Sequence, residues 1–385
     1  MNIPLRIVLI AGEPSGDLLA SKLMRALKNN ATVPIEFCGV GGALMQEQGL
    51  QSLFPMAELS LLGFAEIIPH IPHLLKRIRQ TADEIKRFKP DVVITIDAPE
   101  FCFRVAKKLQ GSGIKLVHYV APSVWAYREH RAEAIAKLYQ HLLVLLPFEP
   151  PYFEKHGLAC SFVGHSIIED AASGGDGELF RHTHHIAPTS PILYMLPGSR
   201  RSEIGRLWPV FAETVNRLAQ KFPDLTIVIA TLPHLAPLLQ APAASLALPA
   251  IVITDKDEKR HALAASTVGL AKSGTGTLEL AIAGLPMIVT YKVKAFSAWL
   301  LRRVIKISYV SIINLIADKE VIPEYLQERC TAPLLAEALE DYLHAPEKRD
   351  VQRGEMMAAL KQLGYGDTAS PSEKAALAVL GVIEG

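Results

Sequence analysis

A glycine-rich turn leads directly into a helix in the stretch Lys272-Ser-Gly-Thr-Gly-Thr-Leu-Glu279-Leu-Ala-Ile-Ala-Gly284-Leu-Pro286. The apolar run Val268–Ala271 before it predicts the end of a strand, so the stretch forms one strand-turn-helix unit of an α/β fold. Backbone amides at the start of a helix bind anions, because they are unpaired and lie at the positive end of the helix dipole. We therefore expect a phosphate to lie against Ser273, Gly274, Thr275, Gly276 and Thr277.

The acid on this helix extends the interpretation. Glu279 would lie about one helical turn beyond the phosphate, where its carboxylate could accept hydrogen bonds from ribose hydroxyls. Phosphate and ribose together indicate a nucleotide. The alternative is an ordinary turn capped by Ser273 or Thr275, with Glu279 as a favourable charge near the helix start. The stretch alone leaves both interpretations open.

Short apolar runs alternate with helical periodicity along the rest of the chain. Continuous Val, Ile and Leu runs predict strands of a parallel sheet that is buried on both faces. The pattern breaks at Ser173–Pro191 and then restarts. The expected strands are Arg6–Ala11, Glu36–Val40, Val92–Ile96, Leu116–Val120, Leu142–Leu146, Ser161–Val163, Ile192–Leu196, Thr226–Ala230, Ile251–Thr254, Thr267–Ala271 and Met287–Tyr291.

This alternation predicts an α/β protein with two Rossmann-like parallel-sheet domains that face a cleft. Residues 1–172 would form an N-terminal, acceptor-side domain, and residues 191–350 a nucleotide-binding domain. Residues 173–190, rich in glycine and histidine, are expected to be a linker. Residues 351–385 would form a helical tail whose last segment, from Ser372, returns to the first domain.

The composition excludes several classes of protein. The 385 residues exceed one typical core and indicate two domains. A formal net charge of +1 gives no reason to expect nucleic acid as a partner. The 4 cysteines form no C-x-x-C pair and indicate neither disulfides nor zinc, which fits a reducing cytoplasm. The run Ile7–Ala11 is too short for a signal peptide, and no window supplies the roughly 18 apolar residues of a membrane span.

A second anion-binding loop follows the first strand of the second domain. Its sequence is Leu196-Pro-Gly-Ser-Arg200-Arg201-Ser-Glu203. An arginine at the carboxyl end of a strand, beside small residues, suits a bidentate grip on a phosphate. We therefore expect Ser199 and Arg200 to bind the nucleotide, the alternative being a surface arginine on an ordinary loop.

The first strand of the chain is followed by an acidic loop, Gly12-Glu-Pro-Ser-Gly-Asp17. It lacks G-x-G-x-x-G, and its carboxylates would repel a pyrophosphate. Glu13, Ser15 and Asp17 better suit sugar hydroxyls, although Asp17 could equally be a favourable charge at a helix start.

Asp97 ends a buried strand and therefore faces the crevice of an open parallel sheet. A carboxylate shielded there from water could take a proton from an alcohol. The alternative role is a helix cap ahead of Pro99. Another strand end, His118–Tyr127, contains Ser123 and other groups that could line a sugar or acyl site, whereas His118 itself is expected to be packed in the core.

Large apolar side chains gather on the connector before residue 72. Pro69 and Pro72 are expected to prevent a continuous helix there, and basic residues follow closely. An exposed apolar patch beside positive charge is typical of a peripheral protein at an anionic membrane, the alternative being that the segment is buried. The expected membrane or acyl contacts are Leu61, Leu62, Phe64, Ile67, Ile68 and Ile71.

These motifs together resemble those of the bacterial lipid-A-disaccharide synthase family. They occur in the family's order from Gly12 to about Gln327. The usual family residues are replaced at Ala43, Glu100 and Cys102, all on the acceptor side. The matching motifs are Gly12-Glu-Pro-Ser-Gly-Asp17, Gly39-Val-Gly-Gly42 with Met45, Ile96-Asp-Ala-Pro99, His118-Tyr-Val-Ala-Pro-Ser-Val-Trp-Ala126, Leu196-Pro-Gly-Ser-Arg200, Ser273-Gly-Thr and Tyr309-Val-Ser-x-x-Asn314-Leu.

The resemblance implies a GT-B glycosyltransferase that joins UDP-2,3-diacylglucosamine to 2,3-diacylglucosamine 1-phosphate. The products would be UDP and the β-1,6-linked tetraacyl disaccharide 1-phosphate, a precursor of lipid A. Asp97 would be the general base, and Asn314 would help the two phosphate-binding loops to hold UDP. The acceptor-side candidates are Glu13, Ser15, Asp17, Glu66 and Ser123.

No cofactor is expected, because cationic groups would take up the charge of the leaving diphosphate without a metal. The resemblance also implies a peripheral protein on the cytoplasmic face of the inner membrane, and it permits a homodimer through the C-terminal helices. The alternatives are another UDP-GlcNAc-type glycosyltransferase, a UDP-GlcNAc 2-epimerase or a non-catalytic membrane-binding protein. A nucleotide-dependent oxidoreductase is disfavoured, since no G-x-G-x-x-G is followed by an acid about 20 residues later.

Overall fold

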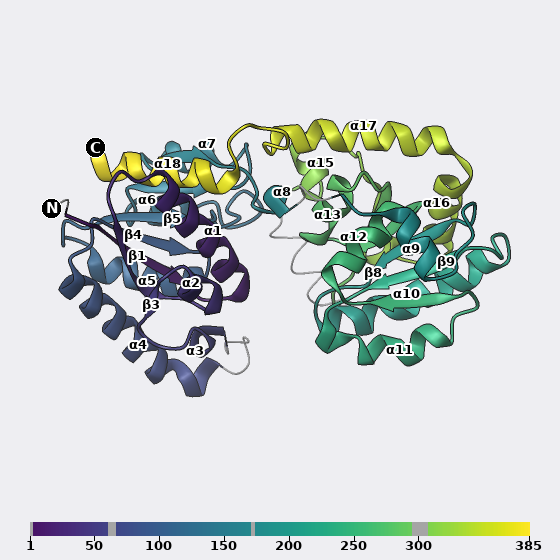
Figure 1. Ribbon diagram of the computed structural model, residues 1–385, viewed down its shortest axis with the longest axis horizontal. Helices are drawn as coiled ribbons and strands as arrows, with labels where there is room; N and C mark the ends of the chain where they lie inside the picture. The colour runs from purple at the N-terminus through teal and green to yellow at the C-terminus, as the bar shows by residue number, and fades with distance from the viewer. Residues whose placement is uncertain (1–2, 61–66, 171–173, 295–306) are drawn as a thin grey trace. The chain divides into compact units, whose positions relative to one another are not determined.

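The computed structural model describes residues 3–60, 67–170, 174–294 and 307–385, and the chain divides into two compact units (Figure 1). Unit 1 comprises Met1–Ser166 together with Gly366–Gly385, and unit 2 comprises Ile167–Tyr365. Each unit is built on one parallel sheet, which confirms the predicted fold class.

The sheet of unit 1 has the strand order β3-β2-β1-β4-β5-β6-β7. Its strands alternate between two cores: Val8 and Ile10 pack with helices α4 and α5, whereas Ile7 and Leu9 pack with α1 and α18. Burial on both faces is why these strands are continuously apolar. The strands are β1 Leu5–Ala11, β2 Ile35–Val40, β3 Gln51–Ser52, β4 Val92–Ile96, β5 Lys115–Tyr119, β6 His141–Val144 and β7 Ala159–Phe162. The helices are α1 Pro14–Asn30, α2 Ala43–Glu47, α3 Ala57–Ser60, α4 Ile67–Phe88, α5 Pro99–Leu109, α6 Arg131–Ala136, α7 Pro150–Glu154 and α18 Pro371–Glu384.

The sheet of unit 2 has the order β10-β9-β8-β11-β12-β13. The strands are β8 Ile192–Leu196, β9 Thr226–Ala230, β10 Ala250–Ile253, β11 Val268–Lys272, β12 Met287–Tyr291 and β13 Glu324–Leu326. The helices are α8 Ile167–Asp170, α9 Gly177–Thr183, α10 Arg201–Ala219, α11 Pro237–Ala244, α12 Lys256–Ala265, α13 Gly276–Ile282, α15 Ile312–Ala317, α16 Ala332–His344 and α17 Pro346–Gln362, with short 3₁₀ turns at Pro233–Leu235 and Gln327–Arg329.

Each expected strand is present, with bounds that differ by at most two residues. The two strands that the sequence did not predict, β3 and β13, contain only 2 and 3 residues, too few to carry a periodic signal. Strand order reverses between β1 and β4 in unit 1 and between β8 and β11 in unit 2. Ligands of open α/β sheets bind beyond the carboxyl ends of the strands at such a reversal, and the predicted loops follow these four strands.

The expected linker, of which the structure describes residues 174–190, belongs to unit 2, and the boundary between the units lies at Ser166 rather than at residue 172. Asp176 caps helix α9 by accepting a hydrogen bond from the Leu179 amide at 2.9 Å, and α9 packs against α12. A side chain at Gly175 would lie 1.9 Å from the Arg260 carbonyl oxygen. Gly175, one of the glycines that suggested flexibility, is therefore needed for close packing, whereas a Cβ on Gly174 would meet no atom within 4 Å.

The C-terminal tail divides between the units. Helix α17 and the residues up to Tyr365 belong to unit 2, whereas the whole of residues 351–385 was expected to join the first domain. Helix α18 does return to unit 1, where it packs against α1 and confirms the predicted return from Ser372. Its start is fixed by a capping box between Ser370 and Glu373, and its end by Lys115, which donates to the Val382 and Ile383 carbonyls at 2.9 and 3.0 Å.

Helix α4 begins at Ile67 and continues through both prolines, so the expectation that they prevent a helix is wrong. Pro69 is the third residue of the helix, where the missing amide would have had no partner within the helix. Pro72 removes one further amide near the same end. Pro69 therefore costs the helix little, whereas Pro72 removes one hydrogen bond within the helix.

Candidate functional site

The glycine-rich turn lies between β11 and α13, where the sequence predicted it. The amide and the hydroxyl of Thr277 both donate to the Gly274 carbonyl oxygen, at 3.0 and 2.7 Å. The Ser273 hydroxyl donates to the Val310 carbonyl oxygen at 3.2 Å. These bonds shape the turn, so the expectation that Ser273 and Thr277 face the ligand is corrected. Gly274, Thr275 and Gly276 stay predicted phosphate contacts.

A pocket within unit 2 opens beside this turn and encloses roughly 140 Å³. The Lys272 Nζ atom lies 3.4 Å from the place where a Cβ on Gly274 would stand, so the pocket and the turn adjoin. The lining carries four cationic side chains and one carboxylate, and this excess of positive charge suits a diphosphate. The lining residues are Arg200, Ser202, Glu203, Arg206, Leu207, Lys272, Tyr291, Lys292 and Val293.

Arg200 is the N-cap residue of α10 and lines this pocket, and its contact with a phosphate stays a prediction. Its side chain is 77% exposed and therefore accessible to a ligand. Ser199 is more constrained, because its amide donates to a Glu203 carboxylate oxygen at 2.9 Å.

The sequence interpretation missed Lys272, Lys292 and Arg206 as pocket residues. Lys272 ends β11, and Lys292 directly follows β12. The rule that selected Arg200, a cation at the carboxyl end of a buried strand, applies equally to both lysines and could have found them. Arg206 lies one turn into α10 and gives no such signal.

Asn314 was expected to help bind the nucleotide, and the structure gives it another role. Its side chain is 0% exposed. The Oδ1 atom accepts from the Val321 and Ile322 amides at 2.9 and 2.8 Å, while Nδ2 donates to the Ile322 carbonyl and to Glu324 at 2.7 and 2.9 Å. All the bonding capacity of the amide is used inside the protein, so Asn314 fixes the loop before β13.

Glu279 is exposed on the first turn of α13, as predicted. Burial lowers the pKa of Lys259 on α12, and the nearby Glu279 charge opposes that change. Glu279 therefore lies in a mixed-charge surface, and contact with a ribose stays a prediction.

Asp97 lies between β4 and α5 in a strained turn of unit 1. Asp97 and Ala98 have φ values of 49° and 44°, in the left-handed region. Burial raises the pKa of the Asp97 carboxyl, although a hydrogen bond from the Ala98 amide partly opposes this. The N-cap of α5 is Ala98, one residue later, so Asp97 is not the cap that the alternative required.

Two neighbouring loops confirm that this strand end is tightly built. A Cβ on Gly12 would lie 2.8 Å from the Ala98 Cβ, so only glycine lets the loop after β1 approach the Asp97 turn. Val120, directly after β5, has a φ of 79°, which is costly for a β-branched residue. Strain of this kind gathers at functional sites.

Asp17 has a structural role rather than the expected contact with a sugar. Its carboxylate is 5% exposed and accepts hydrogen bonds from the Gly42, Leu44 and Met45 amides at 2.9, 3.2 and 3.1 Å. These amides begin α2, so Asp17 stabilises that helix start. The open alternative, a favourable charge at a helix start, is confirmed: Asp17 lies in the first turn of α1 and also binds the amides that begin α2.

The other acceptor-side candidates differ in what the structure says of them. Glu13, Ser15 and Ser123 are exposed at the ends of β1 and β5, so each is accessible, and a role in acceptor binding stays a prediction. Glu66 lies outside the described residues. His118 is completely buried, with Nδ1 2.7 Å from the Thr95 hydroxyl, and burial lowers its pKa to about 3. It is the packed residue that the sequence predicted.

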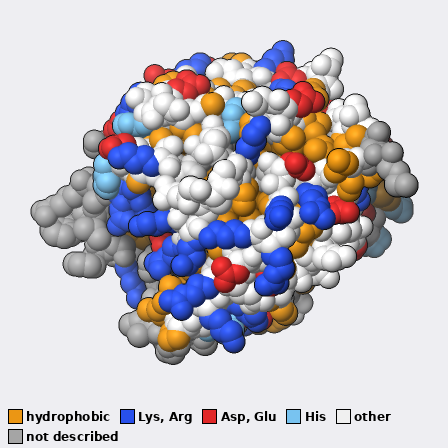
Figure 2. All heavy atoms as spheres, turned by 90° about the vertical axis from the view of Figure 1, so that its left-hand side faces the viewer, with side chains coloured by type: hydrophobic (Ala, Val, Ile, Leu, Met, Phe, Trp, Pro, Cys, Tyr) orange, Lys and Arg blue, Asp and Glu red, His pale blue; other side chains and the backbone are white. Residues whose placement is uncertain are grey.

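The expected membrane contacts lie mostly outside what the structure describes. Leu61, Leu62 and Phe64 are outside the described residues, and Ile67 and Ile68 are placed only by the backbone of α4. Ile71 and Leu75 are 41% and 40% exposed, and a shallow hollow beside them is lined by Pro72, Leu75, Lys76, Arg79 and Gln80. Figure 2 shows many Lys and Arg side chains, with apolar ones among them, in the lower part of this face of unit 1.

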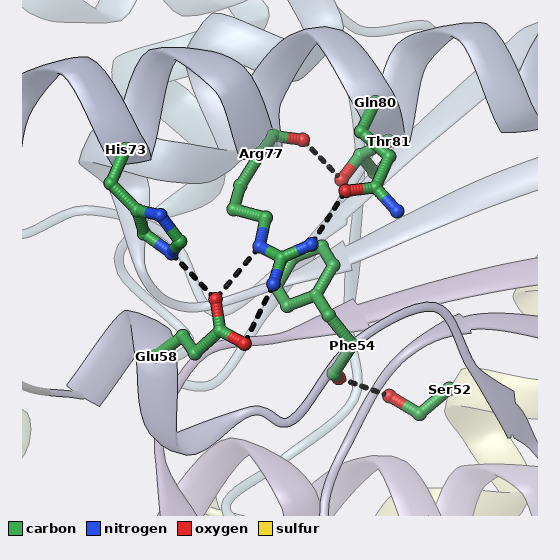
Figure 3. Close-up of polar contacts among 7 residues, drawn as sticks. All are labelled: Ser52, Phe54, Glu58, His73, Arg77, Gln80 and Thr81. Carbon is green, nitrogen blue, oxygen red and sulfur yellow. Dashed lines mark hydrogen bonds and ion pairs between the residues drawn. The ribbon is translucent and has the colours of Figure 1, made fainter.

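Helix α4 is held in place by a polar contact with α3, which Figure 3 shows. The Arg77 guanidinium donates to both Glu58 carboxylate oxygens, at 2.7 and 2.8 Å, and lies 4.6 Å from the centre of the Phe54 ring. His73 adds a third contact to Glu58 at 2.6 Å. These contacts leave Ile71 and Leu75 on the side of α4 that faces solvent.

Comparison with known proteins identifies the family. A family model described as lipid-A-disaccharide synthetase matches residues 7–379. The lipid-A-disaccharide synthase of Rhodospirillum centenum is 49% identical over 382 residues, which covers 99% of this chain and 95% of that protein. The chain belongs to the lipid-A-disaccharide synthase family. The lipid-A-disaccharide synthase of Paramagnetospirillum magneticum is 44% identical over 381 residues, which covers 98% of this chain and 97% of that protein.

Membership of the lipid-A-disaccharide synthase family confirms the predicted resemblance and the predicted enzyme class, a glycosyltransferase of lipid A synthesis. Solved structures share the fold. UDP-GlcNAc 2-epimerase from Neisseria meningitidis has a TM-score of 0.64 at 13% identity and covers 99% of this chain and 100% of its own. MurG from Acinetobacter baumannii has a TM-score of 0.59 at 14% identity and covers 99% of both chains. At such identities the likeness concerns the fold alone.

Two findings concern only the part of the chain that the structure describes. None of its helices is long and apolar enough to cross a membrane. Among the same residues, no group of three or more His, Cys, Asp or Glu side chains is arranged to hold a metal ion.

Proposed function

We propose that this chain transfers 2,3-diacylglucosamine from UDP to 2,3-diacylglucosamine 1-phosphate. The observation that carries the proposal is the cationic pocket of Arg200, Arg206, Lys272 and Lys292, in a chain of this family. The pocket lies at the carboxyl ends of β8, β11 and β12, where parallel α/β sheets bind nucleotides. The diphosphate of the donor is proposed to occupy it, with the ribose towards Glu279.

Asp97 is proposed to act as the general base. It would accept the proton of the acceptor's 6-hydroxyl while that oxygen bonds to the anomeric carbon of the donor. The bond from this carbon to the diphosphate breaks with its electron pair, UDP leaves, and the α configuration inverts to a β-1,6 linkage. A pKa raised by burial makes the Asp97 carboxylate a stronger base than an exposed aspartate.

The leaving group is proposed to be stabilised by the pocket without a cofactor. Negative charge develops on the diphosphate as the sugar departs, and the four cations that line the pocket would interact more strongly with the transition state than with the donor. We therefore expect activity in the presence of a metal chelator, and activity that depends on added metal would contradict this part of the proposal.

Because the substrates are acylated, the reaction is proposed to take place at a membrane, and the cytoplasmic face of the inner membrane is the proposed location. Exposed Ile71 and Leu75 would enter the interface, and Lys76 and Arg79 would meet anionic headgroups. The segment from Leu61 to Phe64 is proposed to contact the acyl chains.

A homodimer through the C-terminal helices is also proposed. Helix α18 packs on α1 of its own chain across a largely apolar contact, and exchange of α18 between two copies would preserve that contact. Light scattering after gel filtration tests it, and a monomer at micromolar concentration would contradict it.

Another UDP-GlcNAc glycosyltransferase or a 2-epimerase would be compatible with the fold. The exposed apolar and basic side of α4 favours acylated substrates, because a soluble sugar has no use for it. Incubation with UDP-GlcNAc alone separates these classes: accumulation of an epimer would favour the epimerase.

Calorimetry with UDP tests the donor pocket. Arg200→Ala should weaken UDP binding by about 10-fold or more, because a charge-assisted hydrogen bond is worth about 1.5–3 kcal/mol. The matched control is Arg217→Ala on the same helix, where Arg217 pairs with Glu213 on the helix surface, away from the residues that line the pocket. Equal UDP affinity in wild type and Arg200→Ala would count against the pocket.

A further inference from the structure

A carboxylate lies among the four cations of the proposed donor pocket. Glu203 is on the first turn of α10 and is 8% exposed. Because it lines the pocket, it is close to any ligand that fills the pocket. A negative charge there should repel a diphosphate. Its presence needs a reason that outweighs this repulsion.

The contacts of Glu203 supply that reason, because one carboxylate joins the two phosphate-binding loops. Its Oε2 atom accepts from the Ser199 amide at 2.9 Å and from the Ser199 hydroxyl at 3.4 Å. Its Oε1 atom lies 3.1 Å from Lys272 Nζ and 3.5 Å from Arg200 Nη1. Glu203 therefore links the loop after β8 to the end of β11.

The local backbone is built for this link. Gly198 has a φ of 127°, and a Cβ on it would lie 2.7 Å from the Glu203 Cβ. Glycine is thus required for the loop to fold back onto the acid. Burial by itself would raise the pKa of Glu203, but the Ser199 amide and the Lys272 ammonium lower it, so the group is ionised near neutral pH.

Lys272 is confined between two groups. Its side chain is 16% exposed, with Glu203 on one side and the Tyr291 ring centre 5.5 Å from Nζ on the other. A lysine has a flexible four-carbon stem and loses much conformational freedom when it binds a ligand. The Glu203 carboxylate fixes the ammonium before the ligand arrives, which removes part of that cost on binding.

We propose that Glu203 is a positioning residue of the donor site, which holds Lys272 and Arg200 in the arrangement that receives the diphosphate. This inference rests on the proposed function, because it takes the donor pocket to be the UDP site. It adds that Lys272 contacts the diphosphate and that Glu203 acts through it.

The direction in which Glu203→Gln changes the affinity for UDP separates a positioning role from a role in charge balance alone. Glu203→Gln removes a negative charge, so charge balance alone predicts tighter binding of UDP. Loss of positioning predicts weaker binding, roughly 10-fold in the Kd from calorimetry, since displaced contact groups can cost about 100-fold. With both substrates, the KM for the donor should rise while the KM for the acceptor stays unchanged.

A double-mutant cycle then asks whether Glu203 acts through Lys272. Lys272→Met should itself weaken UDP binding by roughly 10-fold, and Glu203→Gln should cost less than about 3-fold in the Lys272→Met background. The matched control is Glu213→Gln, an exposed acid on the same helix with an Arg217 partner. It should leave the UDP affinity unchanged.

The outcomes are distinct. If the wild-type protein does not bind UDP, the donor site fails and this inference fails with it. If the wild type binds UDP and Glu203→Gln binds equally well or better, the donor site stands and the positioning role is overturned. If Glu203→Gln does not fold, Lys272→Met decides: weaker binding supports the inference, and unchanged binding overturns it.

Discussion

Replacing Asp97 with Asn should remove most of the turnover while the protein stays folded. Asn has nearly the same shape as Asp but cannot act as a base. Asp97 and Ala98 both have left-handed φ values, and Asn tolerates that region better than most residues, so the turn should persist. Alanine would add about 1 kcal/mol of backbone strain, which makes Asn the better substitution.

The expected loss follows from the chemistry of a general base. Such a group contributes about 10² to 10⁴ in rate, which corresponds to roughly 3–5 kcal/mol of transition-state stabilisation. Because burial raises the pKa of Asp97, wild-type turnover should rise with pH through a limb that lies above the range of an exposed aspartate. That limb should be absent from the residual activity of Asp97→Asn.

The assay is the initial rate of UDP release with both substrates in detergent, together with calorimetry of UDP binding and a thermal unfolding scan. UDP affinity should stay within about twofold, since Asp97 is not among the residues that line the pocket. The matched control is Glu100→Gln, a nearby acid that is 72% exposed and makes only long ion pairs of 3.5 and 3.8 Å. Turnover of Asp97→Asn within tenfold of wild type, or an equal loss in Glu100→Gln, would refute the assignment.

Three further predictions concern stability and the membrane. Asn314→Ala should lower the free energy of unfolding in urea by roughly 3 kcal/mol, because it leaves buried amides and carbonyls unpaired. Burial raises the pKa of Glu149 from 4.5 to about 7, so the folded state keeps a proton there that the unfolded chain releases, and stability should fall as pH rises from 4.5 to 7. Glu149→Gln should remove up to about 3 kcal/mol of that pH dependence in urea unfolding. The pair Ile71→Ser and Leu75→Ser should reduce flotation with anionic vesicles several-fold.

Each of these has a control that uses the same kind of residue in a different setting. Asn216→Ala removes one weak surface bond of 3.4 Å and should cost less than about 0.5 kcal/mol. Glu154→Gln, an exposed position of α7, should keep the fall in stability that Glu149 causes between pH 4.5 and 7. Leu377→Ser, which is 54% exposed on α18, should leave flotation unchanged. Equal effects in a variant and its control would contradict the corresponding role.

Much of the fold was predictable because parallel strands buried on both faces are continuously apolar, a signal that the short strands β3 and β13 do not carry. The positions of Asp97 and Arg200 were predictable for a related reason. The carboxyl ends of strands in an open parallel sheet border the crevice where ligands bind, and both residues follow such ends. Lys272 also lies at the carboxyl end of a strand, so the same rule applies to it, although it was not among the predicted phosphate contacts.

The roles of Asp17 and Asn314 were not predictable from the residues. Each binds backbone amides of another segment, and a sequence gives the type of a side chain without the position of its partners. The prediction of a flexible linker was wrong for a similar reason. Glycine in a sequence suggests flexibility, whereas Gly175 allows close contact with the Arg260 backbone. Polar residues at loops therefore identify candidates, and tertiary contacts decide which of them remain free for a ligand.

Mass spectrometry of the product formed from UDP-2,3-diacylglucosamine and 2,3-diacylglucosamine 1-phosphate tests the central claim most directly. Glycosyl transfer predicts a tetraacyl disaccharide 1-phosphate with a β-1,6 linkage and an equal amount of UDP. Unchanged substrates, or conversion of the donor without a disaccharide, would contradict it.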